Sequence, residues 1–108
     1  MSIVTIYSIP QQHFREVMTA NFCGDNAFLQ TVKKCLPDYT PGCTVKYHLD
    51  GIEAAEEAFD LTNNPMREEQ KLRTYGHSRS VCVGDVVNVT NNGVEENFVC
   101  MSAGWARI

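Results

Sequence analysis

The dipeptide Asn92-Gly93, set between two apolar runs, constrains the fold of this chain more strongly than any other feature. Asn and Gly tolerate the positive φ angles of a two-residue type I′ turn, so Val86–Thr90 and Asn97–Ala103 are predicted to pair as a β-hairpin. A loop of two residues also fixes the register of the pairing. The opposed residues are then Val89 and Glu96, Val87 and Phe98, and Val86 and Val99.

Both faces of this predicted hairpin are apolar. One face carries Val83, Val87, Val89, Phe98 and Cys100. The other face carries Cys82, Val86, Val99, Met101 and Ala103. Strands that are apolar on both sides are typical of the middle of a sheet, so we expect the hairpin to be central in it.

The first residues predict a strand followed by a helix. Residues 2–9 are rich in β-branched and aromatic side chains, which indicates a strand, and apolar residues of both parities predict burial on both faces. Pro10 fits the first turn of a helix, and Phe14, Val17 and Met18 then fall on one side of it. We therefore expect a short helix directly after the first strand.

The middle of the chain predicts one further helix, a strand and a connector. The helix is expected to begin at Gly24-Asp25 and to end before Pro37, because apolar residues recur between them at helical spacing. Residues 43–49 alternate well enough for a half-buried strand. Residues 65–71 are charged and carry little apolar surface, so we interpret them as a solvated connector.

A third helix is predicted to begin at Asp50, because Glu53 follows three residues later as in a capping box. In this helix Ile52, Ala55 and Phe59 are expected to form the buried stripe, with the acidic residues facing water. A chain of 108 residues buries a single core. The sequence therefore predicts one α+β domain over residues 1–108, with about three helices packed on a curled, mainly antiparallel sheet of four or more strands.

Charge and composition argue against two classes of binding partner, nucleic acids and membranes. The net charge is −4, which disfavours nucleic-acid binding because affinity for the phosphate backbone depends on Lys and Arg. No apolar run is long enough to cross a bilayer, so no membrane partner is expected. The first residues carry no basic segment or cleavage site, and we expect a cytoplasmic protein.

The five cysteines include no Cys-x-x-Cys pair, which favours free thiols in a reducing compartment. Structural zinc usually takes its ligands in close pairs, so widely spaced candidates predict no metal site and no cofactor. Those candidates are Cys23, Cys35, Cys43 and His48. Cys82 and Cys100 fall in predicted buried strands, where a thiol stays protonated, so a cysteine nucleophile is not expected.

The polar loop before the hairpin supplies the candidate site. Asp85 is a lone carboxylate within a Val-rich run, and we expect it to accept hydrogen bonds from donors in Ser78–Ser80. Gly84 is expected to bend the strand, so both residues are given structural roles.

Rigidly held polar groups suit recognition, and the only tryptophan suits an interface anchor. The candidate binding residues are His77, Ser78, Arg79 and Trp105.

Three stretches together resemble a known family. They are Ile6-Tyr7, the run Gly76-His77-Ser78-Arg79-Ser80-Val81-Cys82-Val83-Gly84-Asp85-Val86-Val87, and Gly104-Trp105. This order resembles the YodL-like small domain of Gram-positive bacteria, phages and conjugative elements. The likeness is fullest over residues 75–105, and the sequence departs from the family at residues 65–73 and in its cysteine-containing middle. The family has no established catalytic residues, so the resemblance implies an accessory or regulatory protein that acts by binding and transfers no active site.

These observations favour a small phage or mobile-element accessory protein that binds, and possibly inhibits, a host protein, without enzymatic activity. An alternative is a nucleic-acid-binding domain of the PUA-like kind, which a basic cleft with aromatic residues would support. A third reading is a small enzyme, which would need a pocket joining His77, Arg79 and Asp85. The oligomeric state is left open.

Overall fold

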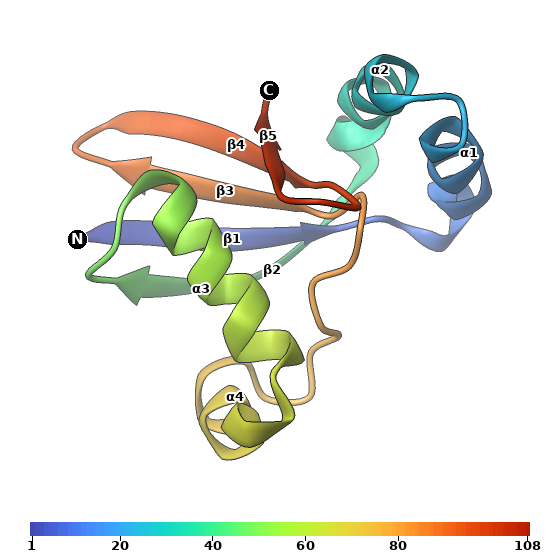
Figure 1. The fold of residues 1–108 in the computed structure, drawn as a ribbon. Coiled ribbons are helices and arrows are strands. Elements are labelled where there is room, and N and C mark those ends of the chain that lie inside the picture. The colour runs from blue at the N-terminus through green and yellow to red at the C-terminus, as the bar shows by residue number, and fades with distance from the viewer.

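The computed structural model describes residues 1–108 as a five-stranded antiparallel sheet with four α-helices, which confirms the α+β class (Figure 1). The elements are β1 (Ser2–Ser8), α1 (Gln11–Asn21), α2 (Asp25–Cys35), the 3₁₀ turn η1 (Leu36–Asp38), β2 (Thr40–Tyr47), α3 (Gly51–Asn63), the 3₁₀ turn η2 (Pro65–Arg67), α4 (Glu68–Tyr75), β3 (Val86–Asn91), β4 (Val94–Cys100) and β5 (Trp105–Arg107). The order of strands across the sheet is β2-β1-β3-β4-β5. None of the helices is both long and apolar enough to span a membrane.

The hairpin forms in the predicted register. Val89 lies opposite Glu96, Val87 opposite Phe98 and Val86 opposite Val99. Asn92 and Gly93 have φ angles of 52° and 79°, as a tight turn with two left-handed residues requires. β3 is central, as predicted, and β4 ends at Cys100 because the chain turns back there and adds the short strand β5.

Two apolar clusters cover opposite faces of the sheet, because successive side chains of β3 and β4 alternate between them. The cluster on the α3 face contains Val4, Ile6, Ala54, Ala55, Ala58, Leu61, Tyr75, Val81, Val87, Val89, Phe98 and Cys100. The cluster on the α1 and α2 face contains Ile9, Val17, Phe28, Val32, Cys35, Tyr39, Val86 and Val99. Figure 1 shows α3 across the strands, and α1 and α2 side by side near the end of β1.

The predicted helices α1, α2 and α3 are present, but α3 buries a different stripe from the one expected. Its buried residues are Ala54, Ala55, Ala58, Leu61 and Thr62. The small alanines let the helix lie close to the sheet, whereas Ile52 and Phe59 are 44% and 39% exposed. Asp50 is the N-cap residue, yet its side chain makes no capping hydrogen bond. The expected stripe is therefore confirmed at Ala55 and wrong at Ile52 and Phe59, and the helix begins after Asp50 as predicted but without the capping-box hydrogen bond.

One further prediction of burial was wrong, and one segment has more regular structure than expected. In β1, Val4 is buried but Ile3 is 44% exposed, because α1 and α2 cover only one end of the second face of the sheet. The connector over residues 65–71 is solvated, as predicted, because none of its residues is buried, but it is also helical, since it forms η2 and the start of α4. Asn64 begins this segment, and its side-chain oxygen accepts a hydrogen bond from the backbone nitrogen of Met66.

Candidate functional site

Asp85 is fully buried at the start of β3 and accepts three hydrogen bonds. Its Oδ1 accepts from the backbone nitrogen of Ile9 and from Arg79 Nη2, each at 2.9 Å. Its Oδ2 accepts from the backbone nitrogen of Cys82 at 2.8 Å. Asp85 is hydrogen-bonded as expected, but no backbone or hydroxyl donor of Ser78–Ser80 takes part, and two backbone amides from elsewhere and the Arg79 guanidinium bind it instead.

Gly84 closes the loop tightly against the sheet. Its φ angle is +91°, and a Cβ atom added there would lie 2.6 Å from Ile9 Cδ1. Its carbonyl oxygen accepts a hydrogen bond of 2.8 Å from the Tyr39 hydroxyl, and its nitrogen donates to the Cys100 carbonyl oxygen at 2.8 Å. Both a left-handed backbone and the lack of a side chain are therefore needed at this position.

The turn at Cys82–Asp85 moves two side chains from their predicted places. Because the strand begins only at Val86, Val83 packs with the α1 and α2 cluster rather than on the α3 face. Cys82 is exposed, which corrects its prediction as a buried strand residue. Cys100 is buried, as expected, and burial raises the pKa of its thiol to about 11.

Ser78 and Arg79 line a small hollow of about 230 Å³ where β1 ends and β2 begins. The rest of its wall comes from Ile6, Ser8, Thr40, Pro41, Gly42, Cys43 and Tyr75. Asp85 binds Nη2 of Arg79, yet the Arg79 side chain remains 43% exposed. Burial opposes the charge, but the adjacent Asp85 carboxylate outweighs it and raises the pKa of the guanidinium. The hollow therefore presents a guanidinium that stays protonated and is paired on one side with Asp85.

β2 forms one wall of this hollow and one edge of the sheet. It pairs only with β1, so its outer backbone groups bond to no strand. Thr40–Thr44 are all exposed. Pro41 and Gly42 shorten the regular part of this edge, where the register with β1 also shifts. An unpaired edge of this kind can accept an extended peptide as an additional strand.

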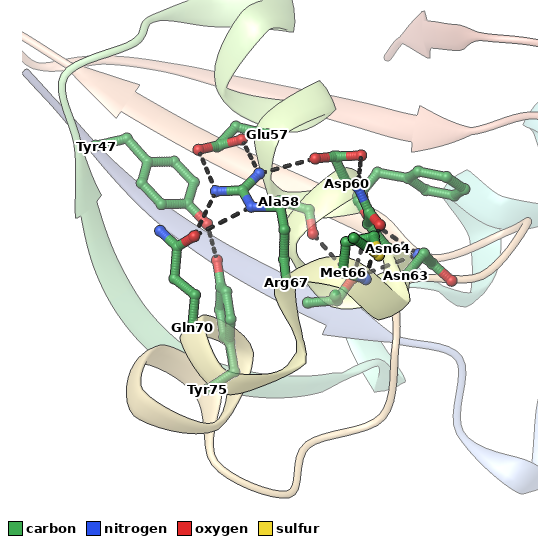
Figure 2. A network of polar contacts seen from close by, with 12 residues as sticks. Tyr47, Glu57, Ala58, Asp60, Asn63, Asn64, Met66, Arg67, Gln70 and Tyr75 are labelled. Carbon is green, nitrogen blue, oxygen red and sulfur yellow. Dashed lines mark hydrogen bonds and ion pairs between the residues drawn. The ribbon is translucent and has the colours of Figure 1, made fainter.

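A polar network fixes α4 behind the hollow (Figure 2). The Arg67 guanidinium bridges α3 and α4, with Nη1 2.6 Å from Glu57 Oε1 and 2.8 Å from Asp60 Oδ2. The hydroxyls of Tyr47 and Tyr75 form a short hydrogen bond, and burial raises the pKa of both phenols. Tyr75 also lines the hollow, so its hydrogen bond to Tyr47 helps to position this part of the wall.

The four predicted binding residues do not form one site. Ser78 and Arg79 share the hollow, whereas His77 is exposed on the same loop and is not part of its wall. Trp105 lies in a separate depression with Ile52 and Phe59, and its ring meets Phe59 edge-on at 6.2 Å between centroids. The interface-anchor hypothesis for Trp105 therefore concerns a second surface.

The hollow also does not bring together His77, Arg79 and Asp85, the three residues that a small enzyme would need in one pocket. Arg79 and Asp85 are paired, but Asp85 is fully buried and His77 is outside the wall. The contribution of Thr40–Cys43 to this hollow was not predicted from the sequence, which indicates only a turn and a strand there. Pro41-Gly42, next to a strand of alternating residues, is the signal that could have indicated a sheet edge.

Comparison of the chain with protein-family models, with curated proteins and with solved structures gave no match.

Proposed function

We propose that this protein is a protein-binding module, an accessory protein of a phage or mobile element that binds and inhibits a host protein in the cytoplasm. The observation that carries the proposal is the unpaired edge of β2 beside the hollow that exposes the Arg79 guanidinium. The phage or mobile-element origin rests on the resemblance of residues 75–105 to the YodL-like domain.

The partner we propose is an extended protein segment that carries a carboxylate. Its backbone would add to the outer edge of β2, where main-chain hydrogen bonds supply affinity without sequence preference. Specificity would come from Arg79, whose planar guanidinium has five N–H donors, while Asp85 engages only Nη2. Because Asp85 fixes one end of the guanidinium, binding a second carboxylate costs little additional ordering.

The test uses a matched pair of substitutions at Ser78. Its side chain is exposed and makes no hydrogen bond, so both variants should fold normally. Ser78→Glu places a negative charge beside Arg79, whereas Ser78→Gln adds similar bulk without charge. We expect Ser78→Glu to weaken capture of a host protein at least tenfold at low salt, and Ser78→Gln to weaken it much less. Ser102→Glu, at an exposed residue outside this hollow, is the control for net charge.

Capture is measured by tagged pull-down from host lysate with and without nuclease, followed by titration with synthetic acidic and neutral peptides from the captured protein. Equal capture by the two Ser78 variants would remove the hollow from the interface. Loss of capture after nuclease treatment would favour the nucleic-acid alternative. Capture that survives Ser78→Glu but is lost with Ile52→Glu would instead assign binding to the depression around Trp105.

A further inference from the structure

A second group of chemically reactive side chains lies between α1 and α2, which cover the other face of the sheet from α3. His13 and Glu16 occupy one face of α1, three residues apart, and Cys35 is the last residue of α2. One potential ligand atom from each residue lies within 4.8 Å of the other two. None of them belongs to the Arg79 hollow, so this group is independent of the proposed function.

The hydrogen bonds of His13 leave one ring nitrogen facing a carboxylate. Nε2 lies 2.8 Å from Asp38 Oδ2, and because an ionised carboxylate can only accept, Nε2 is the donor. In a neutral ring Nδ1 then carries a lone pair, and it faces Glu16 Oε1 at 3.4 Å. Two lone pairs in this arrangement repel each other unless a cation lies between them. A proton or a metal ion can supply that charge.

The position of Cys35 favours a metal ion over a proton. Its Sγ atom donates to the same oxygen, Glu16 Oε1, at 3.5 Å. A bridging proton needs only the ring and the carboxylate, whereas a metal ion also uses the sulfur. Tetrahedral zinc separates its N, O and S ligand atoms by roughly 3.3–3.8 Å. The separations of 3.4 and 3.5 Å from Glu16 Oε1 fall in this range, and the third separation, between His13 Nδ1 and Cys35 Sγ, is within 4.8 Å.

We propose that His13 Nδ1, Glu16 Oε1 and Cys35 Sγ form a zinc-binding site that joins α1 to α2. Imidazole, carboxylate and thiolate together suit Zn²⁺ better than Mg²⁺ or Ca²⁺, which prefer oxygen ligands. Asp38 holds the far ring nitrogen of His13, in the way that carboxylates orient zinc-bound histidines. The side chain of Glu16 is 41% exposed, which gives the ion a path from solvent and leaves room for water as a fourth ligand.

Binding replaces the proton of the Cys35 thiol with a Zn–S bond, and that proton is released to solvent. Glu16, Asp38 and the Cys35 thiolate then carry three negative charges, and Lys34, whose Nζ lies 2.6 Å from Glu16 Oε2, carries one positive charge. A divalent ion balances the difference. Of these three ligands, only Cys35 was among the four metal-binding candidates in the sequence. His13 and Glu16 were not.

The test titrates Co²⁺, and then Zn²⁺, into chelator-treated protein that carries no histidine tag. We expect one Co²⁺ per chain, a thiolate-to-cobalt absorption band, displacement of Co²⁺ by Zn²⁺, and about one proton released per ion. Cys35→Ser should abolish the band, and Cys23→Ser, at an exposed cysteine that follows α1, should leave it intact. Asp38→Asn should weaken binding by about tenfold while the stoichiometry stays at one.

Because Cys35 is buried, its variant could unfold, so His13→Gln provides a second test at a partly exposed position. Circular dichroism verifies that each variant is folded. We expect folded His13→Gln to bind Co²⁺ at least tenfold more weakly than the wild type. Unchanged affinity in His13→Gln, a band that persists in Cys35→Ser, or the lack of any band in the wild type would overturn the proposal.

Discussion

Asp85 Oδ1 lies 2.9 Å from the backbone nitrogen of Ile9, so a carboxylate at the start of β3 holds the residue that follows the end of β1. The same carboxylate accepts from the Cys82 amide and thereby closes the loop before β3. Since Arg79 binds this group as well, the loop that presents the hollow and the end of β1 both depend on one buried side chain. Stability and the shape of the candidate site are therefore coupled through Asp85.

This coupling predicts a large cost for Asp85→Ala. The substitution leaves the amides of Ile9 and Cys82 without acceptors, which should lower the free energy of unfolding by about 2–4 kcal/mol. Arg79→Ala should cost less, about 1 kcal/mol, because its side chain is half exposed and Asp85 keeps both amide donors. Urea unfolding of the two variants provides the comparison. Equal costs would show that the ion pair, rather than the amides, carries the stabilisation.

The role of Asp85 was predictable from sequence, but its partners were not. A lone carboxylate among valines must be hydrogen-bonded, so a structural role follows from composition alone. Nothing local indicates that Ile9, 76 residues away, supplies one donor. The sequence pointed to the nearby serines because they are close along the chain, whereas the fold brings the end of β1 closer. Long-range pairing of strands is the information that a single sequence lacks.

Gly84→Ala is predicted to be among the most damaging single changes in the chain. The added Cβ would meet Ile9 Cδ1 at 2.6 Å, and the φ angle of +91° is strained for alanine. Together these effects should cost roughly 2–5 kcal/mol. Gly93→Ala is the matched control, because its φ angle is also positive at +79° but no atom lies within 4 Å. Thermal denaturation should show a clearly smaller loss for Gly93→Ala, and similar losses would exclude the contact with Ile9 as a cause.

The hairpin register predicts which apolar residues of β4 matter. Phe98 is 5% exposed in the core beneath α3, so Phe98→Ala should cost about 3–5 kcal/mol. Val94→Ala, in the same strand but at a residue that is 64% exposed, should change stability by less than about 1 kcal/mol. Chemical denaturation measures both. A cost for Val94→Ala that approached that of Phe98→Ala would indicate that the solution register differs from the one described.

The predicted elements are present, and the predictions were wrong only where tertiary packing outweighed the local sequence pattern. The hairpin register followed from the turn alone, because two residues leave no other alignment. The buried stripe of α3 did not, since the expected stripe followed the larger residues Ile52 and Phe59 while close approach to the sheet selected the alanines. Likewise, Arg67 contacts Glu57 and Asp60 on another helix, so the charged segment is ordered by partners that its own sequence does not reveal.

Stability is predicted to fall at alkaline pH through the buried thiols. Burial raises the pKa of Cys100 from 9.0 to about 11, and it raises the pKa of Cys35 as well. Below pH 9 the folded and unfolded chains both keep these protons, so the stabilisation is fully present. Between about pH 9 and 11 the unfolded Cys100 thiol ionises while the folded one stays protonated, which favours unfolding. In the metal-free protein the raised pKa of Cys35 acts in the same direction.

The measurement is the urea midpoint as a function of pH across that window, with Cys100→Ala and Cys23→Ala for comparison. Cys100→Ala removes one of the titrating groups, so its midpoint should decline less steeply with pH than that of the wild type. Cys23 is exposed, and its removal should leave the slope unchanged. If the slope were the same in all three proteins, the tyrosines with raised pKa values, Tyr39, Tyr47 and Tyr75, would have to account for the alkaline loss instead.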